Sequence, residues 1–327
     1  MSDETSDPKI RIGWFLSSEE HDPRDLVRDA VNAESAGFVT AMISDHLRPW
    51  TRRQGQASHV WTVLGAIAHA TDVLEIGTGV TAIVHRNDPI NVAHAAATVA
   101  LCSGDRFFLG VGTGERLNEQ PFGERWSRVG ERRDQLEEAI GIMQSLWAGG
   151  NVNHRGTWNV ENLQLLTRPA RPPLLFVASS GKRSAALAGK IADGMIGVAA
   201  DRRLVEVFRG SGGAGKPCLG QVHVSIAATM DEAVDNAWNW WPHIVVPPQI
   251  LGELARLEHF ESTAEAIGRA RISDMVVCAT SAEPVIAAID AFVAAGYDTV
   301  YLHQVGPDQA RLAAMATAEL LPRYATP

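Results

Sequence analysis

Polar and ionisable residues stand at the ends of several short apolar segments. Asp45-His46 comes directly after one segment, and Glu115 follows the glycine turn Gly112–Gly114 after another. A histidine beside a carboxylate is a candidate proton acceptor near neutral pH, and glycine lets a ligand approach the backbone closely. Each also has a structural interpretation: Asp45-His46 as a helix cap, and Glu115 as the partner of a helix dipole. Their matching positions favour one shared site, because structural carboxylates have no reason to converge.

The segment Ser179–Arg183 has the composition of an anion-binding turn. Small residues lead there into a helical pattern that opens with two cations. Free backbone N–H groups at a helix N-terminus bind phosphate, and the helix dipole supports the same charge. Serine-rich turns also cap helices without any ligand, so both interpretations stay open.

Other clusters are less specific. The arginines at 48, 52 and 53 form either a solvated loop or a contact with an anionic cofactor, and the tryptophans at 238, 240 and 241 either pack a helix or wall a substrate pocket. The sequence has neither an HExxH nor a CxxC pattern, and its histidines are scattered, so we expect no metal site. GxSxG and Walker A patterns are also absent, which argues against a serine nucleophile and a P-loop.

Eight apolar or β-branched segments predict the strands that position these residues. We expect strands at Ile10–Leu16, Val39–Ser44, Leu74–Val80, Arg106–Val111, Leu174–Ala178, Gly194–Val198, Gln221–Ala228 and Thr299–His303. Strands that alternate with helical patterns and are apolar throughout indicate a parallel sheet covered by helices. Eight such units favour an α/β fold of the (β/α)8 TIM-barrel type, in which chemistry takes place at the carboxyl ends of the strands.

Three helices are predicted by a helical period of apolar residues and by residues typical of helix ends. They are expected from Asp22-Pro23 to a stop at Gly37, over Gly130–Ala148 and over Ala282–Ala295. Residues 151–173 predict a hairpin-like insertion and residues 241–274 a helical one. Since no linker, repeat or low-complexity segment divides the chain, we expect residues 1–327 to form a single domain.

Composition excludes several classes of protein. The chain has 327 residues, of which 46% are hydrophobic, so it can bury a large core, and its formal charge of −9 argues against a dedicated nucleic-acid binder. The polar start MSDETSDPK and the lack of a long apolar stretch predict a cytoplasmic protein with no membrane partner. Three widely spaced cysteines fit reduced thiols.

Four motifs together resemble the F420-dependent glucose-6-phosphate dehydrogenase group of the bacterial luciferase-like (LLM class) oxidoreductase superfamily. They are SDHLRPW at Ser44–Trp50, IGTGV at Ile76–Val80, GVGTGERLNE at Gly110–Glu119 and ASSG at Ala178–Gly181. The similarity extends from Lys9 to Arg323. It implies a luciferase-like TIM barrel that forms a homodimer and binds the deazaflavin F420 in the barrel mouth.

The resemblance also implies roles for single residues. His46 would take a hydroxyl proton, Glu115 would be the acid or stabilise the transition state, and Trp50 would pack in the active site. Gly79-Val80 would form a non-proline cis peptide beneath the cofactor ring. The remaining cofactor contacts that it implies are Asp45, Thr78, Thr113, Gly114 and Asn118, with Ala178, Ser179, Ser180 and Gly181 at the phosphate.

Differences from the family pattern limit the class of substrate that we expect. Three cations that hold the sugar phosphate in the family fall on Asp201, Leu251 and Met275 in this chain. A phosphate would lose its charged partners there, so we expect hydride transfer between F420 and a small non-phosphorylated alcohol or carbonyl compound. The segments Val245–Pro248 and Tyr301–Gly306 resemble a side branch suspected of using ordinary flavin. FMN is therefore the alternative cofactor, and a non-catalytic flavin-binding protein is a further alternative.

Overall fold

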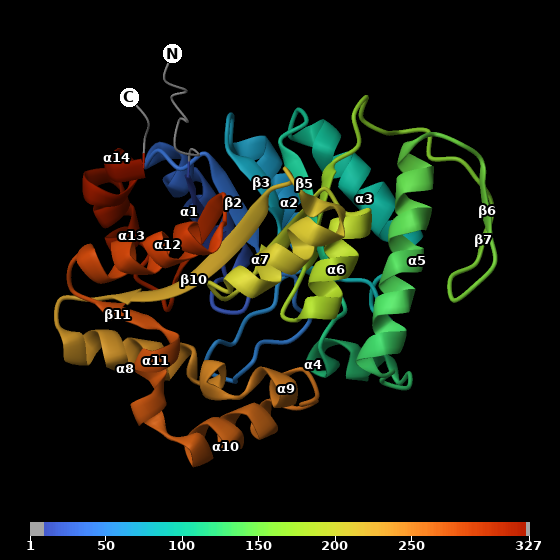
Figure 1. Ribbon diagram of the computed structural model, residues 1–327. Coiled ribbons are helices and arrows are strands. Elements are labelled where there is room, and N and C mark those ends of the chain that lie inside the picture. The colour runs from blue at the N-terminus through green and yellow to red at the C-terminus, as the bar shows by residue number, and fades with distance from the viewer. Residues whose placement is uncertain (1–9, 325–327) are drawn as a thin grey trace.

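Eight parallel strands close into a barrel in the computed structural model, which describes residues 10–324. The barrel order follows the chain, and the circle closes because β9 pairs with β10 as well as with β8. The predicted TIM barrel is therefore confirmed (Figure 1). Its strands are β1 (Arg11–Leu16), β2 (Thr40–Ile43), β3 (Glu75–Thr78), β5 (Phe107–Gly112), β8 (Leu174–Ala178), β9 (Gly194–Gly197), β10 (Cys218–Ile226) and β12 (Thr299–Gln304).

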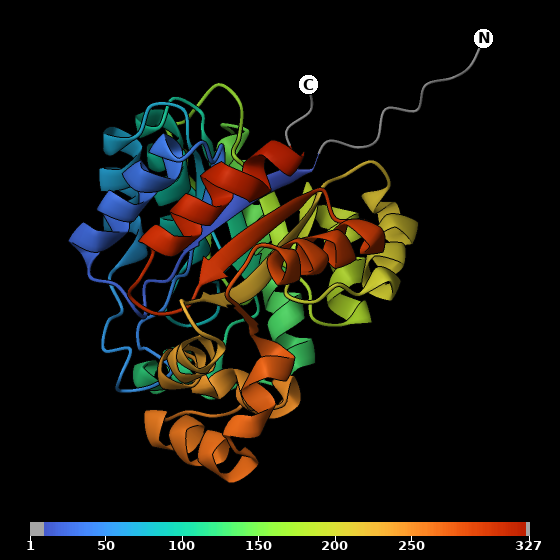
Figure 2. The ribbon, with the colours of Figure 1, turned by 90° about the vertical axis from the view of Figure 1, so that its left-hand side faces the viewer.

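Helices surround the barrel on its outer side (Figure 2). The three predicted helices are confirmed to within two residues at each end, as α1, α5 and α12. Helix α1 begins where expected because Asp22 accepts hydrogen bonds from the N–H groups of Arg24 and Asp25, and Pro23 occupies the first turn. The outer helices are α1 (Pro23–Ser35), α2 (Val60–Ala70), α3 (Pro89–Cys102), α5 (Val129–Trp147), α6 (Lys182–Ile191), α7 (Arg202–Phe208), α12 (Glu283–Ala295), α13 (Ala310–Met315) and α14 (Leu321–Tyr324).

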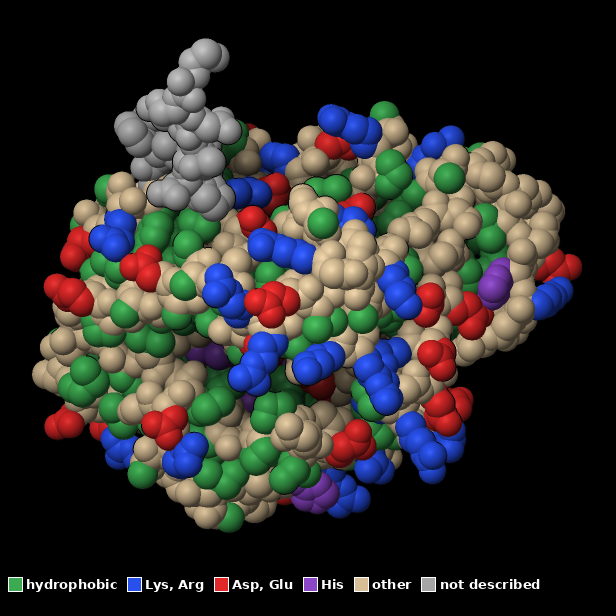
Figure 3. Space-filling model, in the orientation of Figure 1, with side chains coloured by type: hydrophobic (Ala, Val, Ile, Leu, Met, Phe, Trp, Pro, Cys, Tyr) green, Lys and Arg blue, Asp and Glu red, His purple; other side chains and the backbone are tan. Residues whose placement is uncertain are grey.

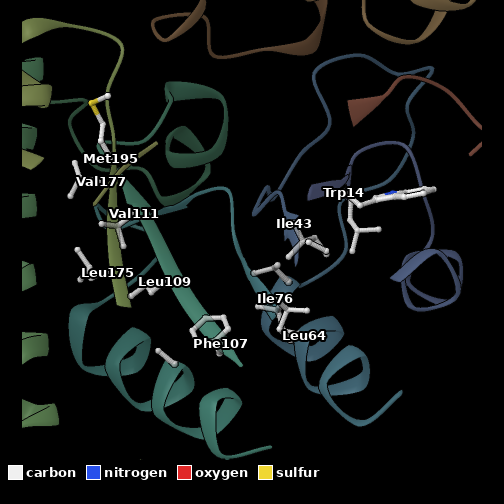
Figure 4. Close-up of a cluster of buried hydrophobic side chains, with 14 of the residues drawn as sticks. Trp14, Ile43, Leu64, Ile76, Phe107, Leu109, Val111, Leu175, Val177 and Met195 are labelled. Atoms are coloured by element: carbon white, nitrogen blue, oxygen red, sulfur yellow. The ribbon is translucent and has the colours of Figure 1, made fainter. Parts of the chain in front are cut away.

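The hydrophobic core has two layers. Outward-facing strand residues such as Ile76 and Leu109 pack beneath the helices with Leu64, all within 1% of complete burial (Figure 4). Large side chains fill the inside of the barrel, so the barrel is a solid support and not a pore. They are Phe15, Met42, Phe108, Phe176, Ile196, Leu219 and Tyr301. This filling forms the floor beneath the carboxyl ends of the strands.

The two segments predicted to be insertions carry elements of their own. Residues 151–173 contain the antiparallel pair β6 (Val152–His154) and β7 (Val160–Leu163). Residues 241–274 are largely helical, with α9 (Pro248–Leu251), α10 (Leu257–Ile267) and the start of α11 (Ile272–Met275). Together with α8 (Met230–Trp240), these helices form a layer across one end of the barrel (Figure 1).

Two short strands were not predicted. Strand β4 (Thr81–Ala82) pairs with β5, and β11 (Val277–Ala279) pairs with the end of β10. Segments of two or three residues are too short to show a period in the sequence. Across residues 10–324, no helix is both long and apolar enough to cross a bilayer.

Candidate active site

His46 lies between two carboxylates at the carboxyl ends of the strands. Its Nε2 is 3.4 Å from Oε2 of Glu115, and its Nδ1 is 3.4 Å from Oε1 of Glu19. The imidazole is 13% exposed, so it is sheltered but still reaches the mouth of the barrel. The structure therefore brings together the two predicted catalytic residues, which follow β2 and β5, and adds Glu19 from the turn after β1.

The Nδ1 atom of His46 has both a donor and an acceptor beside it. The side-chain amide nitrogen of Asn118 is 3.1 Å away, and the carbonyl oxygen of Arg48 is 3.3 Å away. The orientation of this amide is set because its oxygen accepts the N–H groups of Leu47 and Arg48. Either tautomer of His46 is accordingly supported, as a group that takes up and returns a proton requires.

Glu19 is a functional candidate that the sequence analysis missed. Its Oε2 accepts hydrogen bonds from Ser44 at 2.5 Å and from Ser17 at 3.0 Å, and its side chain is 2% exposed. These bonds fix the carboxylate against the His46 loop. A signal was present, since Glu19 and Glu20 come two serines after the first predicted strand, where the carboxyl-end rule applies as it does to Asp45-His46.

Glu115 is held by the turn after β5. Gly114 has a φ of +71°, which favours glycine, and the carbonyl oxygen of Thr113 accepts a hydrogen bond from Arg132. The N–H of Arg116 donates to Gly252 in the helical layer. Desolvation raises the pKa of Glu115, and the neighbouring His46 acts in the opposite direction. A carboxyl group with a raised pKa is suited to hold or deliver a proton.

Two of the predicted cofactor contacts are engaged with the protein itself. Asp45 is buried, with Oδ1 2.8 Å from Arg86 and Oδ2 accepting from Thr81. The hydroxyl of Thr78 exchanges hydrogen bonds with the backbone of Gly110. Asp45 thus forms an ion pair with Arg86 beneath the His46 loop. The sequence analysis did not identify Arg86. Direct contacts of Asp45 and Thr78 with a cofactor remain predictions.

An aromatic wall continues from His46 across the mouth. Trp50 lies 4.8 Å from His46 and stacks on His243 at 4.7 Å, and Trp241 follows at 4.5 Å from His243 (ring centroids). Trp241 is buried in the same hydrophobic cluster as Trp50, so it packs beside the predicted active site, and its role as a pocket wall stays a prediction. Trp240 lies instead beneath Arg53.

The arginine run has a protein partner. Arg52 forms ion pairs with Glu258 and Glu261 of α10. Its charge thereby fastens the loop after β2 to the helical layer. This pairing favours the surface-loop interpretation of Arg52 over a contact with an anionic cofactor.

The N-terminus of α6 has the features expected of an anion site. Gly181 precedes the helix and supplies no side-chain cap, so the N–H groups of the first turn lack a side-chain partner. Ser179 is buried and Ser180 exposed, and the cations Lys182 and Arg183 are exposed beside them. In Figure 3 the surface is hollowed between the barrel and the helical layer, and Lys and Arg side chains border the hollow. The donor set fits a phosphate-bearing ligand.

The backbones of β3 and β5 pack closely against each other at the floor of the barrel mouth. Gly79-Val80 is a cis peptide, as the family resemblance implied. A Cβ atom at Gly110 would lie 2.1 Å from the carbonyl oxygen of Thr78 and 3.0 Å from Val80. Gly110 is buried, and only glycine lets β3 and β5 pack this closely, whereas Gly79 and Val80 are partly exposed. Among the described residues, no group of three or more His, Cys, Asp or Glu side chains could hold a metal ion.

Comparison with known proteins identifies the family. Residues 10–299 match the model of the luciferase-like monooxygenase family. The chain belongs to this family. The F420-dependent glucose-6-phosphate dehydrogenase of Microbacterium testaceum is 31% identical over 327 residues, which cover 96% of this chain and 97% of that protein.

Two further relatives of this luciferase-like protein differ in their substrates. The F420-dependent hydroxymycolic acid dehydrogenase of Mycobacterium tuberculosis is 41% identical over 199 residues, which are 60% of this chain and just 55% of that protein. An F420-dependent secondary alcohol dehydrogenase, solved in complex with an F420–acetone adduct, has a TM-score of 0.90 at 27% identity and covers 97% of this chain and 100% of its own. The predicted family is confirmed, and its relatives indicate F420.

Proposed function

We propose that this luciferase-like protein is an F420-dependent oxidoreductase that interconverts a small, non-phosphorylated alcohol and the corresponding carbonyl compound. The observation that carries the proposal is His46, held between Glu19 and Glu115 at the mouth of the barrel. The relatives named above, which use F420, support the choice of cofactor and reaction.

The residues of the barrel mouth fit F420, and they would bind the cofactor, transfer the proton and exclude water. F420, when bound, supplies the carbon that accepts or gives the hydride. The α6 N-terminus would hold its phosphate, and the partly exposed cis peptide Gly79-Val80 would lie against its ring. His46 takes the hydroxyl proton, Glu115 shares that proton at Nε2, and the wall of Trp50 and Trp241 excludes water.

The apolar side of the mouth supports an uncharged substrate. Leu251 packs against the cluster that contains Trp50 and Leu117, and its neighbour Gly252 bonds to Arg116. Asp201 offers no cation and instead caps α7 by accepting from the N–H of Arg203. Binding a phosphate would require removing its water with no cation at these positions to replace it.

A cofactor titration followed by a substrate panel tests the proposal. Purified protein is titrated with F420 and, separately, with FMN, and the reduction of each bound cofactor is then followed with secondary alcohols and with glucose 6-phosphate. We expect F420 to bind and to be reduced by neutral alcohols. Turnover with FMN but not with F420 would show that the cofactor is FMN. Binding of a cofactor without turnover of any substrate in the panel would favour a non-catalytic flavin-binding protein.

We also propose that the protein is a homodimer, as the family resemblance implies. Sedimentation equilibrium of the purified chain measures this directly. A mass near one chain at micromolar concentration would contradict the proposal.

A further inference from the structure

Arg86 is the centre of a polar network that joins three loops of the barrel mouth, and it has no part in the function proposed so far. It lies in the segment between β4 and α3, and its side chain is 9% exposed. His46 lies in the loop after β2, and Glu115 lies in the turn after β5. Since β3 stands between β2 and β5 in the barrel, the segment of Arg86 lies between the two catalytic loops.

The guanidinium group of Arg86 holds the residue before His46 at two places. Its Nη1 is 2.8 Å from Oδ1 of Asp45, and its Nη2 donates to the carbonyl oxygen of Asp45 at 2.8 Å. The hydroxyl of Thr81, in β4, donates to the other carboxylate oxygen of Asp45. The carbonyl oxygen of Asp45 belongs to the peptide bond that leads into His46. These contacts therefore fix the backbone at the start of the His46 loop as well as a side chain.

The backbone of Arg86 is fixed to the turn that carries Glu115. Oε2 of Glu119 accepts the N–H groups of His85 and Arg86 at 2.8 and 2.9 Å. Glu119 is 1% exposed and is the last residue of α4 (Arg116–Glu119), the short helix that directly follows Glu115. The side chain of Arg86 therefore extends from the Glu115 turn to the His46 loop.

A second contact from α4 holds the other side of the His46 loop. The side-chain oxygen of Asn118 accepts the two backbone N–H groups that follow His46. Arg86 thus fixes the residue before His46, and Asn118 fixes the residues after it. Both contacts connect this loop to the turn of Glu115, so together they set the separation of the two catalytic side chains.

We propose, on the basis of the proposed function, that Arg86 is a positioning residue that holds His46 at its working distance from Glu115. A proton acceptor must lie within hydrogen-bond reach of the hydroxyl group that it deprotonates. A displacement of His46 by about 1 Å would therefore slow the reaction by up to about 10²-fold, although every reacting group is still present.

Lysine at position 86 separates the position of His46 from the charge beside it. The positive charge of Arg86 lowers the pKa of Glu115 and is paired with the buried Asp45. Removing that charge would leave Asp45 as a buried carboxylate without a partner, which is strongly destabilising. Lysine keeps the charge, but its single ammonium group lacks the planar fork that reaches the carboxylate and the carbonyl oxygen of Asp45 together.

Steady-state kinetics of Arg86→Lys, alone and combined with His46→Ala, test the proposal. We expect Arg86→Lys to lower the kcat for oxidation of a neutral secondary alcohol by roughly 10- to 100-fold, while the F420 affinity and the KM for the alcohol change by less than about threefold. In the His46→Ala protein the same substitution should have no further effect on kcat, because Arg86 acts through His46. A wild-type kcat for Arg86→Lys, or an equal loss with and without His46, would overturn the proposal.

Two further variants complete the kinetic test. Arg11→Lys is the matched control, because two nitrogens of Arg11 contact the carboxylate of Glu75 at the amino ends of their strands, away from the mouth. It should keep the wild-type kcat. Thr81→Val removes one hydrogen bond to Asp45 with little change of shape. It should cause a smaller loss of kcat that also disappears without His46, and it supplies the same test if the Arg86 variant does not fold.

Imidazole nitrogen NMR of the protein without cofactor detects the position of His46 independently of turnover. Arg86→Lys should shift the ring resonances of His46 and leave those of His303, on β12, unchanged. Unchanged His46 resonances would overturn the proposal. A wild-type protein that oxidises no alcohol with F420 would refute the proposed function, and a shift of the His46 resonances would still show that Arg86 holds this loop. Alcohol oxidation that Arg86→Lys does not slow would refute the positioning role alone.

Discussion

His46 Nε2 lies 3.4 Å from Glu115 Oε2, although the two residues follow different strands of the barrel. The contact depends on two loops, since Asn118 holds the backbone after His46 and Gly114 turns the chain at Glu115. A proton at Nε2 would therefore lie beside a carboxylate whose pKa is raised by desolvation. This pair is the basis of the first prediction.

Replacing His46 should separate binding from turnover. His46→Ala removes the proton acceptor but none of the residues at the α6 N-terminus, so F420 affinity should persist while kcat falls by about 10²- to 10⁴-fold. Fluorescence titration and steady-state rates measure the two effects. His69→Ala, on the exposed side of α2, is the control. Near-normal turnover of the His46 variant would remove it from the mechanism.

The anion turn should respond to added negative charge. Ser180 is exposed beside the uncapped N–H groups of α6. Ser180→Asp would put a carboxylate where the phosphate of the cofactor is expected, so F420 affinity should fall by about tenfold or more. Ser145→Asp, an exposed position on α5, adds the same charge elsewhere and should leave the affinity unchanged. Equal affinities for the two variants would place the phosphate outside this turn.

Glucose 6-phosphate should be a poor substrate. With Leu251 in an apolar cluster and Asp201 used as a helix cap, the phosphate gains no cation at these positions. A steady-state comparison with neutral secondary alcohols, using F420, gives kcat/KM for each. Oxidation of the sugar phosphate above about 10⁴ M⁻¹s⁻¹, an ordinary value for an enzyme on its own substrate, would show that another cation has replaced the missing three.

Asp29 should make the protein less stable as the pH rises. Burial raises its pKa from 3.8 to about 6, with Arg28 acting in the opposite direction. Between about pH 4 and pH 6 the folded protein keeps a proton that the unfolded chain has released, so the free energy of unfolding falls across this window. Asp29→Asn should abolish that loss and stabilise the protein at pH 7 by up to about 3 kcal/mol.

Denaturant unfolding at pH 4 and pH 7 measures the effect of Asp29. Asp308→Asn, which breaks an exposed ion pair with Arg311, is the matched control and should change the stability by less than about 1 kcal/mol at both values. An Asp29→Asn variant that keeps the wild-type pH dependence would show that this carboxyl group is ionised in the folded protein.

The sequence by itself predicted the barrel and the meeting of His46 and Glu115 at its mouth. Apolar strands that alternate with helices pack well only as a covered parallel sheet, and the carboxyl ends of such strands necessarily share one face. For that reason His46 and Glu115 were predicted to meet, as they do. The helix between Asp22 and Gly37 followed from local capping chemistry, which needs no tertiary information.

Only the tertiary structure decided which side chains pair inside the mouth. His223 and His303 meet because β10 and β12 are paired in one particular register, and a shift by one residue would turn either ring out of the barrel. Burial of Glu20 depends in the same way on the turn after β1 closing against β12. Periodicity determines which face of a strand is apolar, but register, closure and loop packing determine which polar groups are buried together.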